Sequence, residues 1–360
     1  MKYYLIAGEA SGDLHASNLM KELKKFDSNA EFRCWGGDKM EAAGGTIIKH
    51  YRELAFMGFT EVLMNIRTIF ANIDLCKKDI VEWKPNTVIF VDYPGFNLRI
   101  APFVKSIGIK SIWYISPQVW AWKASRVKKI KACVDKMLVI LPFEKEFYQK
   151  WNYEVEYVGH PLLDCLTPIS IIKEEEKIIA LLPGSRKQEI SAMLPEMLNV
   201  VEKFPSYKFV IAGAPSVDEN FYKQFITGKN VSILFGETYS LLEKASAALV
   251  TSGTATLETA LFGVPEVVCY KGSGISFQIA KWLIKVKYIS LVNLIMDKEA
   301  VKELIQEEMN AANIEKELKS LLENKQRIQE MKRDFVLLKE KLGNSGASSR
   351  AAKSIYEFTA

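Results

Sequence analysis

The sequence lacks the features that mark most specialised classes of protein. Only five of its 360 residues are cysteines, and no two lie close together, so neither a redox CxxC pair nor a cysteine-rich zinc site is present. Neither sign of charge dominates, since 48 Lys and Arg stand against 43 Asp and Glu, and the net charge of +5 is too small to imply nucleic-acid binding. The ordinary composition also excludes intrinsic disorder, collagen-like repeats and small disulfide scaffolds.

Long apolar runs are absent as well. The longest uncharged stretch, residues 245–257, contains several Ser and Thr and falls short of the ~20 apolar residues that a membrane-spanning helix needs. At the N-terminus, the apolar run 3–7 stops at Gly8 and Glu9, which is too short for the core of a signal peptide. Together with the scattered thiols, this predicts a cytoplasmic protein.

Short apolar runs alternate with helical patterns along the chain. The runs show no polar alternation, which is typical of parallel strands buried on both faces. They cover residues 3–7, 87–91, 111–115, 137–141, 178–182, 209–212, 231–234, 247–250 and 267–270. Between them, stretches such as 14–25 and 192–203 have apolar residues at helical spacing. The sequence therefore predicts an α/β protein built from Rossmann-like, doubly wound sheets.

One segment interrupts this alternation. Residues 162–176 contain a proline and an acidic triplet but no clear periodicity, so we expect a linker there. The linker divides the chain into a first domain at 1–165 and a second at 166–342. Residues 298–342 are predicted to be helical, and their balanced charges indicate a solvated helical face.

The first strand is followed by the turn GEASGD. Its glycines, Gly8 and Gly12, allow another backbone or a ligand to come close, and the helix that follows offers unpaired N–H groups. The structural alternative is a tight turn in which Ser11 or Asp13 caps the helix.

Asp92 follows the strand predicted at 87–91. Ligands of open α/β sheets bind beyond the carboxyl ends of the strands, so an aspartate at this point is a candidate for proton transfer. The alternative is a turn aspartate held by neighbouring amides. His160 is a weaker candidate, because a lone histidine is more often structural. No DxD, HExxH or GxGxxG motif is present, and we expect neither a metal nor a cofactor.

Two turns in the second half together predict a site for a nucleotide diphosphate. The residues concerned are Gly184, Ser185, Arg186, Ser252, Gly253, Thr254 and Glu258. Arg186 can form a bidentate pair with a phosphate at a helix start, and Glu258 lies one turn into a helix, where a carboxylate suits a ribose diol. Each turn alone also fits an ordinary capped helix start, whereas the two together favour the nucleotide site.

An apolar face at helical spacing begins at residue 56 and continues to residue 73. Such a face usually packs on a core, but its length, its Met and Phe content and its flanking arginines also suit a helix lying on a lipid monolayer. The candidate membrane-contact residues are Phe56, Met57, Phe59, Leu63, Ile66 and Phe70.

Over nearly its whole length, the chain resembles the lipid-A-disaccharide synthase family. The motifs that carry the resemblance are, in order, AGEASGDLHA, LAFMGFTEVL, VDYPGFN, SPQVWAWKASRVKKI, LPFEKEFY, VGHPLLD, LLPGSRKQEI, SGTATLETAL and YISLVNLI. The WAW segment followed by PFE, GHP and PGSR in this order is highly specific. One departure is Gly95, which stands where the family often has a second acidic residue.

The resemblance implies the GT-B fold, with two Rossmann-like domains facing a cleft and a C-terminal helix at about 343–360 packing back on the first domain. It implies a metal-independent, inverting transfer of diacylglucosamine from UDP-2,3-diacylglucosamine to 2,3-diacylglucosamine 1-phosphate, a step in lipid A biosynthesis. Asp92 would be the base, or would orient another group, and Asn293 would lie near the nucleotide. The residues on the acceptor side would be Gly8, Ser11 and Gly12.

Two other interpretations stay open at this point. The chain is also compatible with another UDP-sugar enzyme of the GT-B fold, such as a muramyl-type transferase or a UDP-N-acetylglucosamine 2-epimerase. It is compatible, too, with a non-catalytic, membrane-binding relative. Substrate turnover separates all three.

The basic charge is concentrated in one place. Residues 122–136 carry six Lys and Arg against one Asp, directly after an aromatic stretch. Beside an enzyme of anionic lipids, this predicts peripheral association with the inner membrane, with no nucleic-acid partner. A homodimer is possible, because some relatives exchange C-terminal segments.

Overall fold

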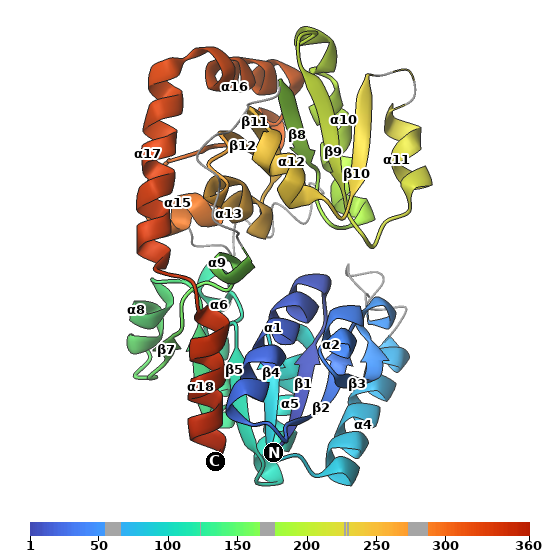
Figure 1. The fold of residues 1–360 in the computed structure, drawn as a ribbon, viewed down its shortest axis with the longest axis vertical. Helices are drawn as coiled ribbons and strands as arrows, with labels where there is room; N and C mark the ends of the chain where they lie inside the picture. Colours follow the sequence, from blue (N-terminus) through green and yellow to red (C-terminus); the bar gives the residue numbers. More distant parts are fainter. Residues whose placement is uncertain (55–65, 123, 166–176, 227, 229, 273–286) are drawn as a thin grey trace. The chain divides into compact units, whose positions relative to one another are not determined.

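The computed structural model describes residues 1–54, 66–122, 124–165, 177–226, 228, 230–272 and 287–360. The chain divides into two compact units, shown in Figure 1. Unit 1 consists of Met1–Cys165 together with Gly343–Ala360, and unit 2 of Leu166–Leu342. Each unit is built on one parallel sheet with helices around it, as expected for strands that are apolar on both faces.

Unit 1 contains a seven-stranded sheet with the order β3-β2-β1-β4-β5-β6-β7. All neighbouring strands are parallel. The strands are β1 (Lys2–Ala7), β2 (Glu31–Gly36), β3 (Gly45–His50), β4 (Thr87–Val91), β5 (Lys110–Tyr114), β6 (Lys136–Val139) and β7 (Glu156–Tyr157). The helices are α1 (Ala10–Phe26), α2 (Asp38–Ala42), α4 (Ile66–Trp83), α5 (Pro94–Ser106), α6 (Val119–Trp122), α7 (Arg126–Cys133), α8 (Glu144–Gln149), α9 (Leu162–Cys165) and α18 (Ala347–Thr359). Fully buried aromatic side chains such as Trp35 and Trp113 fill its core.

Unit 2 contains a six-stranded parallel sheet with the order β10-β9-β8-β11-β12-β13. The strands are β8 (Ile178–Leu182), β9 (Lys208–Gly213), β10 (Val231–Phe235), β11 (Ala247–Thr251), β12 (Glu266–Tyr270) and β13 (Lys302–Ile305). The helices are α10 (Lys187–Leu198), α11 (Glu219–Ile226), α12 (Thr238–Lys244), α13 (Thr254–Leu261), α15 (Leu291–Met296), α16 (Ala311–Glu323) and α17 (Lys325–Leu342). Short 3₁₀ turns lie at Tyr51–Glu53 in unit 1 and at Val201–Lys203 and Gln306–Glu308 in unit 2.

The predicted doubly wound α/β class is confirmed, and each of the nine predicted strands corresponds to an observed one. Within the described residues, four strands were not predicted: β2, β3, β7 and β13. β2 and β3 carry charged or small residues among their apolar ones, because β3 is an edge strand and two positions of β2, Glu31 and Arg33, are at least partly exposed. Strand β7 has only two residues.

The prediction that 298–342 is entirely helical is wrong at its beginning. β13 lies inside this region and pairs in parallel with β12 at the edge of the unit 2 sheet. Its charged residues masked the strand signal, since only Leu304 of the four residues is fully buried. After the 3₁₀ turn Gln306–Glu308, helices α16 and α17 occupy nearly all of residues 311–342, as predicted. The predicted linker begins with the short helix α9, and its residues 166–176 lie outside the described part of the chain.

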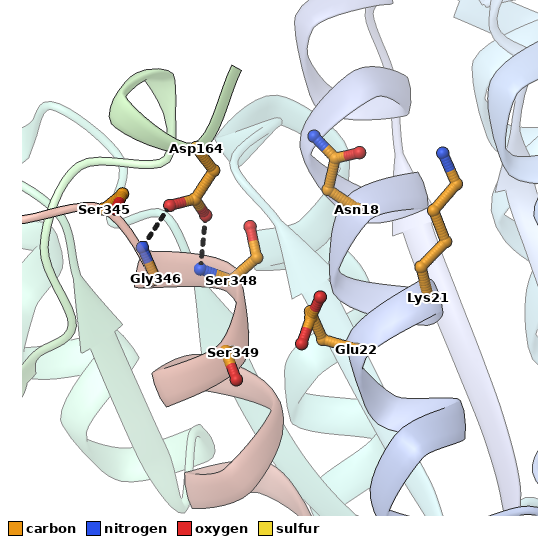
Figure 2. Close-up of a pocket in the computed structure, with 8 residues that line it drawn as sticks. All are labelled: Asn18, Lys21, Glu22, Asp164, Ser345, Gly346, Ser348 and Ser349. Atoms are coloured by element: carbon orange, nitrogen blue, oxygen red, sulfur yellow. Dashed lines mark hydrogen bonds between the residues drawn. The ribbon is translucent and has the colours of Figure 1, made fainter. Parts of the chain in front are cut away.

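The C-terminal helix α18 belongs to unit 1, where it packs along α1. Its N-terminus is held by the Asp164 carboxylate, which accepts the backbone N–H groups of Gly346, Ala347 and Ser348 at 2.5, 3.1 and 2.8 Å. Figure 2 shows the bonds from Gly346 and Ser348. At the other end, the Lys110 ammonium donates to the carbonyl oxygens of Phe358 and Thr359. A negative group at the start of a helix and a positive group at its end both complement the helix dipole.

Candidate active site at two topological switch points

Both sheets reverse their strand order at one point, and ligands of open α/β folds bind at such points. In unit 1 the reversal lies between β1 and β4, where Ala7 is paired with Val91. The turns that begin with Gly8 and with Asp92 therefore leave the sheet side by side. In unit 2 the reversal lies between β8 and β11, where Leu182 is paired with Val250. The residues predicted from the turns after these four strands fall at these two places.

The backbone around Asp92 is strained. Asp92 and Tyr93 have φ angles of 44° and 50°, in the left-handed region that residues other than glycine seldom adopt. Buried contacts hold this conformation: the Asp92 N–H donates to the Tyr114 carbonyl at 3.2 Å, and the Asn97 amide donates to the Asp92 carbonyl at 2.7 Å. Such strain is typical of functional turns whose surroundings fix them.

The Asp92 carboxyl is only partly exposed. Burial, and to a smaller extent the negative charge of Glu9, raise its pKa to about 7, although the hydrogen bond from the N–H of Tyr93 acts in the opposite direction. Glu9 stands in the turn after β1, so the adjacency of the two strand ends produces this electrostatic effect. A carboxylate whose pKa lies near neutrality is suited to accepting a proton at physiological pH.

The glycines of the first turn have packing roles. A Cβ on Gly8 would lie 2.3 Å from Cγ of Tyr93, so only glycine lets that ring approach the backbone. The Tyr93 ring in turn stacks on Phe96 at 5.6 Å between centroids. A Cβ on Gly12 would lie 3.2 Å from the Cβ of Ala7, whereas Ser11 is exposed in the first turn of α1. The first turn and the Asp92 turn therefore pack directly against each other.

In unit 2, the turn after β8 brings Arg186 to the start of α10. Its guanidinium Nη1 donates to Oε1 of Glu189 at 2.9 Å, and the Ser185 N–H donates to Oε2 of the same carboxylate at 2.9 Å. Gly184 has a φ of +117°, which favours glycine, and a Cβ there would lie 2.7 Å from Glu189. The three predicted residues are thus gathered around a carboxylate that was not predicted.

The second turn of unit 2 leads from β11 into α13. Gly253 is exposed with a φ of +153°, and Thr254 is exposed at the first position of the helix. The Ser252 hydroxyl donates to the carbonyl of Ile289 at 2.9 Å. Glu258 accepts a hydrogen bond from the Tyr239 hydroxyl at 3.3 Å, and burial raises its pKa above the usual range.

Asn293 occupies a different environment. Its side chain is fully buried, and its amide exchanges two hydrogen bonds of 2.9 Å with the backbone of Val301 while also donating to Glu303. Glu303 additionally accepts the N–H and hydroxyl of Ser290. Asn293 therefore fixes the loop before β13, and its direct contact with a nucleotide stays a prediction.

The four helices that start at the switch points share one property. Their N-cap residues, Glu9, Tyr93, Arg186 and Gly253, make no side-chain capping hydrogen bond. Elsewhere, Ser290 and Asn310 cap α15 and α16 with their own side chains. The N-cap residues of α2, α7, α8, α12 and α18 make none either. The missing cap therefore does not single out the switch points, but backbone N–H groups at a helix start can bind an anion there.

Several residues of this site were not predicted. Glu189 lies three residues after Arg186, a spacing that in sequence looks like an ordinary surface ion pair on a helix. Asn97 lies in the VDYPGFN motif, but its role depends on a contact that folding creates.

His160, the weaker candidate from the sequence, is buried and accepts the Leu162 N–H through Nδ1. Burial and the charge of His15 lower its pKa to about 3. These features support the structural interpretation of His160.

The predicted membrane-contact residues are only partly described. Phe56, Met57, Phe59 and Leu63 lie outside the described residues, and Ile66 begins α4. Farther along this helix, Ile73 is buried in the core, while the Phe70 side chain is 57% exposed. Among the described helices, none combines the length and apolarity needed to cross a membrane.

The basic segment is partly neutralised. Lys136 pairs with Glu156 at 3.1 Å, and Lys131 donates to the carbonyl oxygens of Trp151 and Asn152. Lys128 and Lys129, on α7, are exposed. The ion pair offsets the charge of Lys136, whereas hydrogen bonds to carbonyl oxygens leave the charge of Lys131 in place. No group of three or more His, Cys, Asp or Glu within the described ranges is arranged to hold a metal ion.

Two Rossmann-like units, each with candidate ligand groups at its switch point, define the GT-B class of nucleotide-sugar enzymes. The fold is similar to that of a UDP-GlcNAc 2-epimerase from Neisseria meningitidis, with a TM-score of 0.69 at 15% identity over 99% of this chain and 100% of the other. It is also similar to the glycosyltransferase of kitacinnamycin, with a TM-score of 0.65 at 13% identity over 99% and 98%. At these identities, the likeness shows the fold alone.

Sequence comparison identifies the family within this class. The lipid-A-disaccharide synthetase family matches residues 3–357. A lipid-A-disaccharide synthase of Syntrophus aciditrophicus is 39% identical over 97% of this chain and 95% of its own, and one of Geobacter metallireducens is 36% identical over 98% and 96%. The chain belongs to the lipid-A-disaccharide synthetase family and is a glycosyltransferase.

Proposed function

We propose that the chain transfers 2,3-diacylglucosamine from UDP-2,3-diacylglucosamine to 2,3-diacylglucosamine 1-phosphate, with Asp92 as the general base. The products are a β-1,6-linked disaccharide 1-phosphate and UDP. Family membership supports the overall reaction. The observation that carries the residue assignment is the partly buried Asp92 at a switch point, on a strained turn, with its pKa raised to about 7.

The proposed step is a single displacement. The acceptor 6-hydroxyl oxygen attacks the anomeric carbon of the donor from the face opposite UDP, and its proton passes to the Asp92 carboxylate. The bond between the anomeric carbon and the phosphate oxygen breaks, and UDP leaves with the electron pair. Attack from the opposite face inverts the anomeric centre. The strain in the Asp92 turn supports this role, because a fixed base needs little reorganisation.

Unit 2 supplies the groups for the leaving diphosphate in this proposal. The Arg186 guanidinium and the Ser185 N–H beside the start of α10, together with the backbone N–H groups at the start of α13, would bind the negative charge of the diphosphate. Ser252, Thr254 and Glu258 follow on the neighbouring turn, where Glu258 would accept hydrogen bonds from the ribose hydroxyls. Asn293 would act indirectly, by fixing the loop whose Ile289 carbonyl holds Ser252.

Turnover by the purified protein tests this function. The protein is incubated with the two diacylated substrates, with EDTA and without added divalent metal, and the products are followed by mass spectrometry. We expect the disaccharide 1-phosphate and UDP in equal amounts. Release of UDP without disaccharide, or conversion of UDP-N-acetylglucosamine to its 2-epimer, would contradict the assignment. A requirement for Mg²⁺ would contradict only the claim that the transfer needs no metal, and would leave the overall reaction in place.

Peripheral association with the inner membrane from the cytoplasmic side is part of the same proposal. Its support is the exposed Phe70 on α4 and the exposed Lys128 and Lys129 on α7. Binding to vesicles containing anionic lipid is expected to weaken as salt increases. Phe70→Ser should reduce binding, whereas Leu337→Ser, at an equally apolar exposed site in unit 2, is the matched control. Salt-insensitive binding, or equal losses in both variants, would count against this surface.

The homodimer expected from the sequence stays a prediction. Light scattering of the purified protein over a range of concentrations measures it directly. A mass that stays at the monomer value of 40.8 kDa would remove the homodimer from the proposal.

A further inference from the structure

The start of α10 is already occupied by a negative group. The Glu189 carboxylate lies over this helix end, where it accepts the Ser185 N–H through one oxygen and the Arg186 guanidinium through the other, both at 2.9 Å. These are the two donors that the proposed function assigns to the diphosphate of the nucleotide. We propose that Glu189 is an internal occupant of the donor-phosphate site, displaced when a nucleotide diphosphate binds. This inference rests on the donor site proposed above.

Comparison with the structural caps of the same chain shows why Glu189 differs from them. Asp164 binds three backbone N–H groups of α18, and Asp13 binds those of Gly37, Lys39 and Met40 at the start of α2. Asp13 is buried, with 2% of its surface exposed. Glu189 binds a single backbone N–H, and its side chain is 32% exposed. Glu189 binds fewer backbone N–H groups than either aspartate and is more exposed than Asp13, so its carboxylate is easier to replace.

The turn itself is built to keep its shape while that side chain moves. The Ser216 hydroxyl, from the turn after β9, donates to the Ser185 carbonyl at 3.2 Å. Gly184 lacks a side chain at the point where a Cβ would lie 2.7 Å from the Cβ and Oε2 of Glu189. The missing Cβ gives the Glu189 side chain room against the backbone. The Ser185 backbone is therefore held by a contact that does not involve the carboxylate.

Exchange of one anion for another follows from simple electrostatics. A diphosphate carries more negative charge than a carboxylate and has more acceptor oxygens, so it competes successfully for Arg186 and the Ser185 N–H. A carboxylate left next to a phosphate would repel it, so Glu189 has to swing away. The cost of displacement lowers the affinity for UDP and speeds its release after the transfer. Uridine, which has no phosphate, is unaffected.

Calorimetric titration of the full-length protein with UDP and with uridine tests this inference. In Glu189→Gln, which keeps the shape of the side chain but removes its charge and one of its two acceptor oxygens, we expect the Kd for UDP to fall about threefold to tenfold. The Kd for uridine should not change. Glu196→Gln is the matched control, because Glu196 lies on the same helix but pairs with Lys271 at 2.7 Å. It should leave both constants unchanged, and thermal unfolding checks that each variant is folded.

The outcomes separate this inference from the proposed function. An unchanged or higher Kd for UDP in Glu189→Gln overturns it, because Glu189 would then only support Arg186. Equal changes for UDP and uridine also overturn it. Arg186→Ala tests the donor site itself: if that variant binds UDP as the wild type does, the proposed donor site is wrong. Loss of UDP binding in Arg186→Ala with no change in Glu189→Gln leaves the site intact and removes only the displacement.

Discussion

The two units have the same topology at their switch points but opposite chemistry. In unit 1, the turns after β1 and β4 bring the carboxyl groups of Glu9 and Asp92 close enough for one to raise the pKa of the other. In unit 2, the turns after β8 and β11 present a guanidinium, hydroxyls and the N-terminal ends of α10 and α13. The sheet topology determines where the ligand-binding groups lie. A few turn residues determine whether the switch point is suited to proton transfer or to phosphate binding.

The most severe test of this comparison is the loss of the base in unit 1. Asp92→Asn keeps the size of the side chain but removes its ability to take a proton, so we expect kcat to fall by about 10²- to 10⁴-fold. UDP binding, assigned to unit 2, should be unchanged by calorimetry. Wild-type activity should rise with pH through about 7, because the base form is required and burial raises its pKa to that value. A variant that retains activity would remove Asp92 from this role.

The same variant, although less active, should be more stable than the wild type at alkaline pH. The pKa of Asp92 is about 7 in the folded protein against roughly 3.9 in an unfolded chain, so the folded state binds the proton more tightly. The wild type therefore loses stability as pH rises from about 4 to about 7, by up to ~1.4 kcal/mol per pH unit. Asn does not ionise, so the Tm of the variant should exceed that of the wild type at pH 8. The two should converge near pH 4.

Loss of the basic group in unit 2 is the reciprocal test. Arg186→Ala removes charge-assisted hydrogen bonds worth about 1.5–3 kcal/mol, so the Kd for UDP should rise by about tenfold to a hundredfold. The pH at which activity rises should stay near 7 in this variant, because that pH reports Asp92. A shifted pH profile would show that the two switch points are not chemically separate.

A third test concerns a carboxyl group that neither site uses. Glu266, at the start of β12, is fully buried, and neither of its oxygens has a hydrogen-bond partner among the described residues. Burial raises its pKa well above the usual range, so unit 2 is destabilised as pH rises above about 4. Glu266→Met should stabilise unit 2 by about 1–3 kcal/mol at pH 8 and by less at pH 5. Equal gains at both pH values in calorimetric unfolding would assign the effect to packing instead.

The smallest expected effect concerns the helix that completes unit 1. Asp164→Ala removes the cap of α18 and should cost about 0.5–2 kcal/mol. Hydrogen exchange should accelerate in α18 and leave the strands of unit 2 unchanged. Asp218→Ala is the control, since Asp218 accepts the Asn220 N–H in unit 2 at 2.8 Å. If unit 2 responded to Asp164→Ala as strongly as α18, the two units would not be independent.

Features that depend on neighbouring residues in the sequence were predicted well, whereas features that depend on contacts between distant residues were not. β4 and β8 match their predicted residues because uninterrupted apolar runs need no knowledge of the rest of the chain. Asp13 was considered as a cap for its own helix, yet it caps α2, whose first residue lies 25 positions further along the sequence. The occupant of the α10 helix start was missed because Glu189 resembles an ordinary surface residue. Family motifs located the site, but the partners within it depend on contacts that only folding creates.

The placement of α18 also bears on how the chain is made. A ribosome synthesises the strands of unit 1 first, then the whole of unit 2, and only afterwards the segment 343–360 that packs on α1. Unit 2 is contiguous and has all its residues available as soon as it emerges, whereas unit 1 must wait with the buried face of α1 uncovered. A nascent chain that stops inside unit 2 would therefore leave the earlier unit incomplete, and this interval is when we expect it to depend most on chaperones.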